Sequence, residues 1–124
     1  MTNNFKDIVA WQKAHTFVLS VYEIAKKFPE YERHGLWSQF TRAAVSIPAN
    51  IAEGYKRISK QEKLRFLNYS QASLEECRYY VVLALDLHYI TPEDAQLLNY
   101  KIEGASWYLN AYADGVAKNS GIKD

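Results

Sequence analysis

TPEDAQLLNYKIEGASWYLNAYADGVAK, residues 91–118, is typical of one long amphipathic helix with a marked start. Thr91 suits the cap position and Pro92 the first helical position, and the two acids that follow face the positive end of the helix dipole. We therefore predict a helix over 92–118. Its apolar residues recur at three- and four-residue steps, the period of one buried face: Leu98, Ile102, Ala105, Leu109, Tyr112 and Val116.

Three upstream stretches have the same helical period, and we expect helices over about 7–28, 35–56 and 60–89. Pro29 ends the first, because the residue before a proline is pushed out of the helical region. The predicted buried stripes are Trp11, Ala14, Val18, Val21, Ala25 and Phe28, then Leu36, Phe40, Ala43, Ile47 and Ile51, then Leu67, Leu74, Cys77, Val81 and Leu85.

The connections between these helices are short, which predicts antiparallel neighbours. Ser59 and Glu62 have the spacing of a capping box and predict two reciprocal bonds at the start of the third helix. The fold class is therefore predicted to be all-α: an up-and-down antiparallel four-helix bundle that forms a single domain, residues 1–124, with a frayed tail over 119–124.

Composition limits the classes of function. The 124 residues are 48% hydrophobic and 23% charged, which is enough for a core and excludes a disordered chain. The net charge of +1 supplies no overall field for nucleic acid or lipid, so an electrostatic partner would need a local patch. No apolar segment follows Met1, and the longest apolar stretch, 79–90, is too short to cross a bilayer. Together with the single cysteine, this predicts a soluble, cytoplasmic protein with no membrane contact.

One segment, RAAVSIPANIAEG at 42–54, departs from a plain bundle helix. Pro48 removes one backbone hydrogen bond and clashes with the Ala44 carbonyl, at a cost of about 3 kcal/mol, so we predict a kink or a broken turn near Pro48, within 45–50. Polar residues follow one line along this helix: Arg42, Ser46, Asn50 and Glu53.

This polar line has two interpretations. Hairpin geometry places it opposite the third helix, which predicts an Arg42–Glu76 ion pair, with Ser46 and Asn50 bonded to backbone groups freed by Pro48. Such residues can form a ligand-binding or catalytic constellation, or a buried polar network that fixes helix register. We favour the network, since buried polar groups are usually there to be satisfied.

Catalytic and metal-binding motifs are absent from the sequence. There is no Glu-x-x-His, His-x-x-x-His, Cys-x-x-Cys, glycine-rich phosphate loop or Gly-x-Ser-x-Gly elbow. Cys77 lies on a core stripe, where a small buried hydrophobe is expected rather than a nucleophile. We expect no catalytic residue, no metal and no cofactor, and therefore no enzyme.

A basic run lies at the turn between the second and third helices. It contains one acid, Glu62, and Tyr55 beside it has a ring that can stack on a base. The ordinary interpretation is a solvated hairpin end; the alternative is a patch that contacts RNA or DNA phosphates. The candidate nucleic-acid-binding residues are Lys56, Arg57, Lys60, Lys63 and Arg65.

Aromatic residues make up 15% of the chain, more than a bundle of this size hides easily. Some of them lie on helix faces other than the predicted core stripes, and helices that are apolar on two sides are buried on two sides. We predict homo-oligomerisation in preference to a different protein partner, with an interface that includes Phe17, Tyr100, Trp107 and Tyr108.

Several of these motifs together resemble a known family. They are WQKA at 11–14, Phe28-Pro29, Gly35-Leu36, Ser38-Gln39, the whole of 42–54, Phe66-Leu67, and SLEE at 73–76. The family is that of small bacterial four-helix-bundle proteins encoded in intervening sequences of 23S ribosomal RNA genes, and the accessory protein of diversity-generating retroelements is similar to it. The resemblance implies a homopentameric ring without enzymatic activity, and, from the retroelement relative, a basic surface that binds nucleic acid and a reverse transcriptase.

Three hypotheses follow. The first is a non-enzymatic, ring-forming protein associated with structured RNA or DNA through the basic run at 56–65. The second is a protein-binding scaffold or adaptor without nucleic-acid contact. The third, an enzyme, requires Arg42, Asn50, Glu53 and Glu76 in one pocket.

Overall fold

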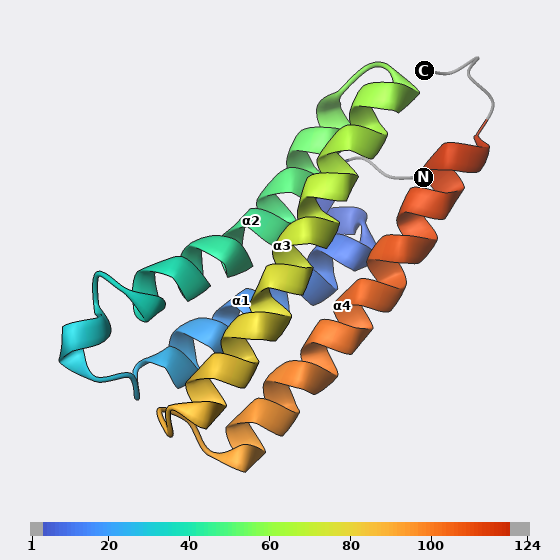
Figure 1. The fold of residues 1–124 in the computed structure, drawn as a ribbon. Helices are drawn as coiled ribbons and strands as arrows, with labels where there is room; N and C mark the ends of the chain where they lie inside the picture. The colour runs from blue at the N-terminus through green and yellow to red at the C-terminus, as the bar shows by residue number, and fades with distance from the viewer. Residues whose placement is uncertain (1–3, 120–124) are drawn as a thin grey trace.

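The computed structural model of the chain describes residues 4–119, which form four antiparallel helices (Figure 1). Helix α1 (Val9–Ala25) packs against α2 (Leu36–Lys56) and α4 (Pro92–Lys118), and α3 (Lys60–Asp86) packs against the same two helices. The predicted all-α, up-and-down four-helix bundle is thereby confirmed, while residues 120–124 of the predicted frayed tail lie outside the described part. Two short 3-10 turns, η1 (Phe5–Asp7) and η2 (Glu30–Glu32), precede α1 and α2.

Two helices end earlier than their apolar pattern suggests. The backbone N–H groups of Lys27 and Phe28 bond carbonyls three residues back, so α1 tightens into a turn ahead of Pro29. At the end of α3, His88 takes a left-handed φ of 64°. The N–H groups of His88 and Tyr89 then reach back to the last turn of α3, which is a Schellman motif with histidine in place of the usual glycine.

The helix starts combine predicted and unpredicted caps. Thr91 and Asp94 form the reciprocal capping box at α4. At α3 only half of the predicted box exists: Ser59 accepts a bond from the Glu62 N–H, but the Glu62 carboxylate bonds Arg65 instead. The start of α2 has no side-chain bond from its own cap residue, and a more distant carboxylate, that of Glu32, accepts from the Leu36 N–H at 2.8 Å.

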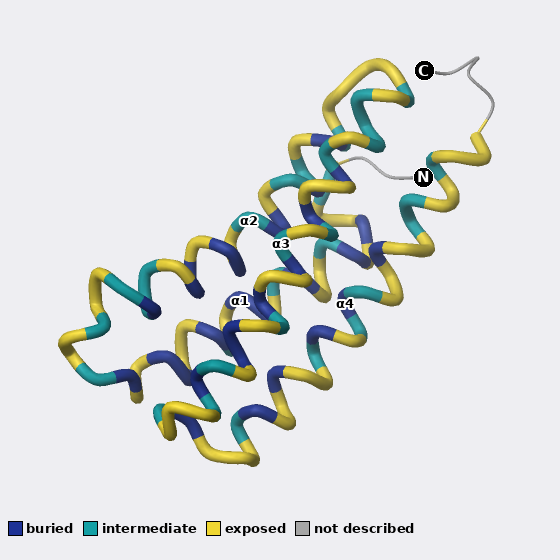
Figure 2. The backbone as a smooth tube through the Cα atoms, in the orientation of Figure 1, coloured by how far each residue is buried: buried dark blue, intermediate teal, exposed yellow. Residues whose placement is uncertain are grey.

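The core follows the predicted stripes. Figure 2 shows buried residues recurring along the inward side of each helix. The exceptions are Trp11, Leu85, Tyr112 and Val116, which are only partly buried. Helix α1 is covered on a second side as well, where Ala10, Phe17 and Ile24 are buried between neighbouring helices.

Pro48 lies inside α2, and the helix is continuous through it. The ribbon of α2 changes direction about half-way along (Figure 1), as predicted for a proline kink, but no turn is lost. No side chain among residues 4–119 bonds the Ala44 carbonyl. The buried partner near the proline comes from α3, where the Ser70 hydroxyl donates to the Ile47 carbonyl at 2.8 Å.

The α4 cap makes the stability of the bundle sensitive to acid. Burial raises the pKa of the Asp94 carboxyl, but bonds from Lys27 and Thr91 outweigh it and lower the pKa overall. A carboxyl whose pKa is lowered by folding stabilises the folded chain. This stabilisation is complete above the pKa of the unfolded chain, about 3.9, and is lost as the pH falls through the pKa of the folded chain.

Asp94→Asn is therefore expected to lower the free energy of unfolding at pH 7 by about 0.5–1 kcal/mol, and by less at pH 3. Urea unfolding followed by circular dichroism at both pH values checks this. Glu93→Gln is the control, because Glu93 is exposed and makes no hydrogen bond or ion pair within the described residues. Equal losses of unfolding free energy at pH 7 and pH 3 would show that the charge of Asp94 is not the source of the acid sensitivity.

Candidate nucleic-acid interface at the α2–α3 hairpin

A tight turn joins α2 to α3. Gly54 allows the two helices to approach, since a Cβ there would lie 3.2 Å from the Phe66 Cβ and 3.3 Å from the Lys63 carbonyl. The backbone is then extended at Arg57 and again at Ser59, where α3 is capped. Between these two residues, the side chain of Ile58 is 81% exposed.

The predicted basic residues do gather at this end of the bundle. Two of them form ion pairs along their own helices: Arg57 with Glu53 at 2.6 Å, and Arg65 with Glu62 at 3.3 Å. All four of these side chains are substantially exposed, so each pair is weak in water.

The three lysines differ in their contacts. Lys63 donates to the Tyr55 carbonyl at 2.9 Å, and Lys60 donates to the Ala117 carbonyl of α4 at 3.0 Å. Lys56 is exposed. Because carbonyls do not neutralise an ammonium group, residues 53–65 keep five cations against two carboxylates, a local excess of three positive charges.

Aromatic rings lie among these cations. The Arg57 guanidinium sits 4.4 Å from the centroid of the Phe66 ring, and Arg65 lies 5.9 Å from the same ring. Phe66 meets the exposed ring of Tyr69 edge-on. Sequence reasoning found only Tyr55, whose ring lies beneath Lys63. It missed Phe66 and Tyr69, since the α2–α3 turn separates them from Arg57 in the chain.

The predicted polar network is only partly formed. The Asn50 amide donates to the carbonyl and hydroxyl of Ser46, and the Ser46 hydroxyl contacts that of Ser73 on α3 at 2.9 Å. These bonds link α2 to α3 as expected, but the Asn50 amide does not reach the carbonyl that Pro48 frees. Glu53 belongs instead to the basic hairpin, through its pair with Arg57.

The predicted Arg42–Glu76 ion pair was wrong. Both residues are exposed on the outer side of α2 and α3, and the Glu76 carboxylate accepts a bond from the Tyr80 hydroxyl at 2.7 Å. Burial and this bond raise the pKa of Tyr80 to about 12. Arg42 and Glu76 line a shallow hollow of about 280 Å³ that lacks Asn50 and Glu53, so the four residues that an enzyme would need are not gathered.

Within residues 4–119, the structure places the cysteine in the core and gathers no set of metal ligands. Cys77 is fully buried, and burial raises the pKa of its thiol to about 12, so the thiol is protonated at neutral pH. The described residues contain no cluster of three or more His, Cys, Asp or Glu side chains placed to hold a metal. Nor does any described helix have the length and apolarity needed to cross a membrane.

The predicted oligomer interface needs one correction. Phe17 is 0% exposed and packs inside the bundle, because α1 is covered by both α2 and α4. By contrast, Tyr100 is 77% exposed and Trp107 65% exposed, and Tyr108 is also on the surface. Only these three of the four predicted residues are available for an interface.

Two of the exposed aromatics of α4, Tyr100 and Trp107, belong to a regular pattern. Leu97, Tyr100, Gly104, Trp107 and Ala111 follow one another at steps of three, four, three and four residues, and we call them the α4 stripe. Such spacing forms a straight seam along a helix, suited to packing against a second helix.

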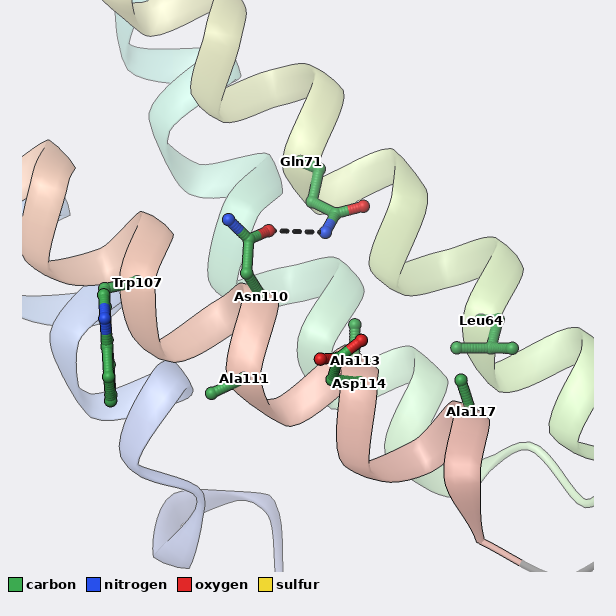
Figure 3. Close-up of a pocket in the computed structure, with 8 residues that line it drawn as sticks. All are labelled: Leu64, Gln71, Trp107, Asn110, Ala111, Ala113, Asp114 and Ala117. Carbon is green, nitrogen blue, oxygen red and sulfur yellow. Dashed lines mark hydrogen bonds between the residues drawn. The ribbon is translucent and has the colours of Figure 1, made fainter.

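A hollow of about 580 Å³ lies beside the α4 stripe, between α3 and α4 (Figure 3). Within it, Gln71 donates to the Asn110 side chain across the two helices at 2.8 Å. Trp107 stands at the edge of the hollow, away from that bond. The remaining lining residues are Leu64, Ala111, Ala113, Asp114 and Ala117.

Comparison with known families agrees with the resemblance noted in the sequence. The model of the 23S rRNA-intervening sequence protein family matches residues 6–111. The chain belongs to this family. The family's match thus includes the basic hairpin and most of α4. None of the curated proteins matches.

A solved structure shares the fold of this 23S rRNA-intervening sequence protein. It is a protein of unknown function from the S23 ribosomal protein family of Bacteroides thetaiotaomicron VPI-5482. The TM-score is 0.77 and the sequence identity 23%, and the match covers 84% of this chain and 97% of the other. At this identity the likeness shows the fold alone.

Proposed function

We propose that this chain is a non-enzymatic, self-associating cytoplasmic protein that binds structured RNA through the α2–α3 hairpin. The observation that carries the proposal is the excess of three positive charges over residues 53–65, beside the exposed ring of Tyr69. Phosphates attract such a patch, and rings next to cations give unpaired bases a surface on which to stack. The family's description, which names an rRNA intervening sequence, agrees with an RNA partner.

The contacts within the hairpin are compatible with this role. Exposed pairs such as Arg57–Glu53 and Arg65–Glu62 each contribute well under 1 kcal/mol, so a phosphate can replace the carboxylate at little cost. The bonds from Lys60 and Lys63 to carbonyls hold these ammonium groups in place without neutralising them.

Binding to a fluorescein-labelled RNA hairpin, followed by anisotropy from 50 to 200 mM salt, tests the proposal. Lys56→Gln combined with Arg65→Gln is expected to weaken binding at 50 mM salt by roughly tenfold or more and to reduce the logarithmic salt slope by about 1.5–2.

The matched control removes one lysine and one arginine from the other end of the bundle: Lys26→Gln with Arg33→Gln, where Arg33 also has an (i, i+3) partner. Equal losses in the two double variants would mean that binding follows net charge alone. An RNA affinity no tighter than that of an acidic control protein at 50 mM salt would refute the proposal.

Self-association is the second part of the proposed function, and the α4 stripe supports it. Its large side chains, with neighbouring Tyr108, expose on the order of 450 Å², about half of what one partner contributes to a standard interface. Gly104 lies mid-way with no atom within 4 Å of a built Cβ, so a second helix can come close there. We infer that the α4 stripe packs against a second copy of the chain, within a ring as the family resemblance implies.

A protein-binding scaffold is the second candidate function, because a different protein could cover the α4 stripe. Affinity capture before and after nuclease treatment separates the two candidates. A scaffold keeps its partner when RNA is removed, whereas an RNA-associated protein loses the partners that RNA brings.

A further inference from the structure

The α2–α3 turn presents an apolar residue that the fold does not explain. Ile58 is 81% exposed, more than any other large hydrophobic residue within 4–119. A β-branched apolar side chain has no advantage in a three-residue turn between helices, where glycine, asparagine or serine is usual. Its neighbours on both sides are polar or charged, so it extends no part of the core.

We propose that Ile58 is a wedge that enters a gap in the base stack of bound RNA and directs the hairpin to bulged helices. This inference rests on the RNA-binding function proposed above. Proteins that distort nucleic acid commonly insert isoleucine, leucine or phenylalanine between bases, while adjacent cations hold the backbone on either side. Ile58 has this setting, with Lys56 and Arg57 before it and Lys60 after it in the chain.

The residues that flank Ile58 are held in place, as a wedge requires. The Arg57 guanidinium is stacked on Phe66, and Ser59 accepts a bond from the Glu62 N–H at 3.1 Å. Because Arg57 and Ser59 are both held, the backbone on each side of Ile58 is fixed. Little conformational freedom remains to be lost when RNA binds.

The form of the target follows from the geometry of RNA. The major groove of a regular RNA helix is deep and narrow, and its stacked bases resist insertion. At a bulge, stacking is already interrupted, so a wedge meets a smaller cost there. We therefore expect a preference for a bulged helix over a regular one, and we assign that preference to Ile58.

An anionic lipid surface is the competing occupant, since an apolar tip among cations can also touch a membrane. One isoleucine gives little apolar area for lasting insertion, whereas base stacking needs only one side chain. The Phe66 ring against Arg57, and the exposed Tyr69 ring against Phe66, also favour bases. RNA is therefore the occupant that we infer.

The test compares a 20-base-pair RNA duplex with the same duplex carrying one bulged nucleotide next to 2-aminopurine. The full chain is expected to bind the bulged RNA on the order of tenfold more tightly and to raise the 2-aminopurine fluorescence as stacking is lost. Ile58→Ser should lose both effects yet keep its affinity and salt slope on the regular duplex, while Ile58→Phe should keep both. Leu19→Ser, at a residue 57% exposed on α1, is the matched control.

The outcomes are separable. A bulge preference that survives in Ile58→Ser would overturn the wedge, even if Lys56→Gln with Arg65→Gln still lowers the salt slope and upholds RNA binding. Equal weakening of Ile58→Ser on both duplexes would also overturn it. Binding to phosphatidylserine vesicles that falls in Ile58→Ser, with RNA binding unchanged, would assign the tip to lipid. No RNA binding by the unaltered chain would refute both the function and the wedge.

Discussion

Phe17→Ala is expected to lower the free energy of unfolding by about 3–5 kcal/mol, the largest effect on stability that we predict. The ring is fully buried in the middle of α1, so its loss leaves a cavity between helices that are already packed on both sides. Urea unfolding followed by circular dichroism measures the change. Leu19→Ala, two residues further along α1 and exposed, should change the same quantity by less than about 0.5 kcal/mol.

The Phe17 result also separates the two roles considered for this residue. A ring inside the bundle should destabilise the chain by the same amount at any protein concentration. An interface ring would instead make the loss depend on concentration, because self-association adds to the apparent stability. A loss confined to high protein concentrations would show that Phe17 faces a second copy and would contradict the packing described here.

The core stripes were predictable because apolar residues recur at helical spacing. The order of the helices was predictable because proline and cap residues mark several of their ends. The predicted helix over 92–118 matches α4 at both bounds, since Thr91 and Pro92 mark its start on the surface. The end of α3 was not predictable in the same way. His88 takes a left-handed φ that normally belongs to glycine, so the sequence shows no stop signal and the apolar pattern continues past the helix.

The candidate site was predictable as a place but not in its contacts. A basic run at a helix turn is visible in the sequence, whereas the choice among nearby partners is not. Glu53 has Arg57 one turn away, and Glu76 has Tyr80 one turn away, so both carboxylates bond within their own helices. Arg42 consequently gains no partner from α3. The energies of alternative pairs between long exposed side chains differ little, so the spacing of residues in the sequence does not reveal which pair forms.

Phe17 shows a different limit. An apolar line on a helix indicates that some surface covers it. The pattern is the same whether that surface is a neighbouring helix of the same chain or a second copy of the chain. The structure separates the two cases. Helix α1 has neighbours on both apolar sides, whereas the α4 stripe keeps Tyr100 and Trp107 in the open.

Trp107→Glu is expected to weaken self-association by 30- to 1000-fold, which corresponds to about 2–4 kcal/mol at a central aromatic residue. Sedimentation equilibrium at 10 μM should give a multiple of 14.3 kDa for the unaltered chain and about 14.3 kDa for the variant. The control is Tyr31→Glu, because Tyr31 is similarly exposed but lies in η2, at the other end of the bundle from the basic hairpin.

Gly104→Leu makes the same test sharper, because stability and assembly should move in opposite directions. A Cβ added at Gly104 meets no atom within 4 Å in the single chain, and leucine favours a helix over glycine by roughly 0.5–1 kcal/mol. The variant should therefore unfold at higher urea concentration. In an α4 stripe packed against a second copy, the same side chain would hold the helices apart, so the mass should fall toward that of one chain. A more stable variant with unchanged assembly would show that copies meet elsewhere and would leave the α4 stripe to a different protein, as a scaffold requires.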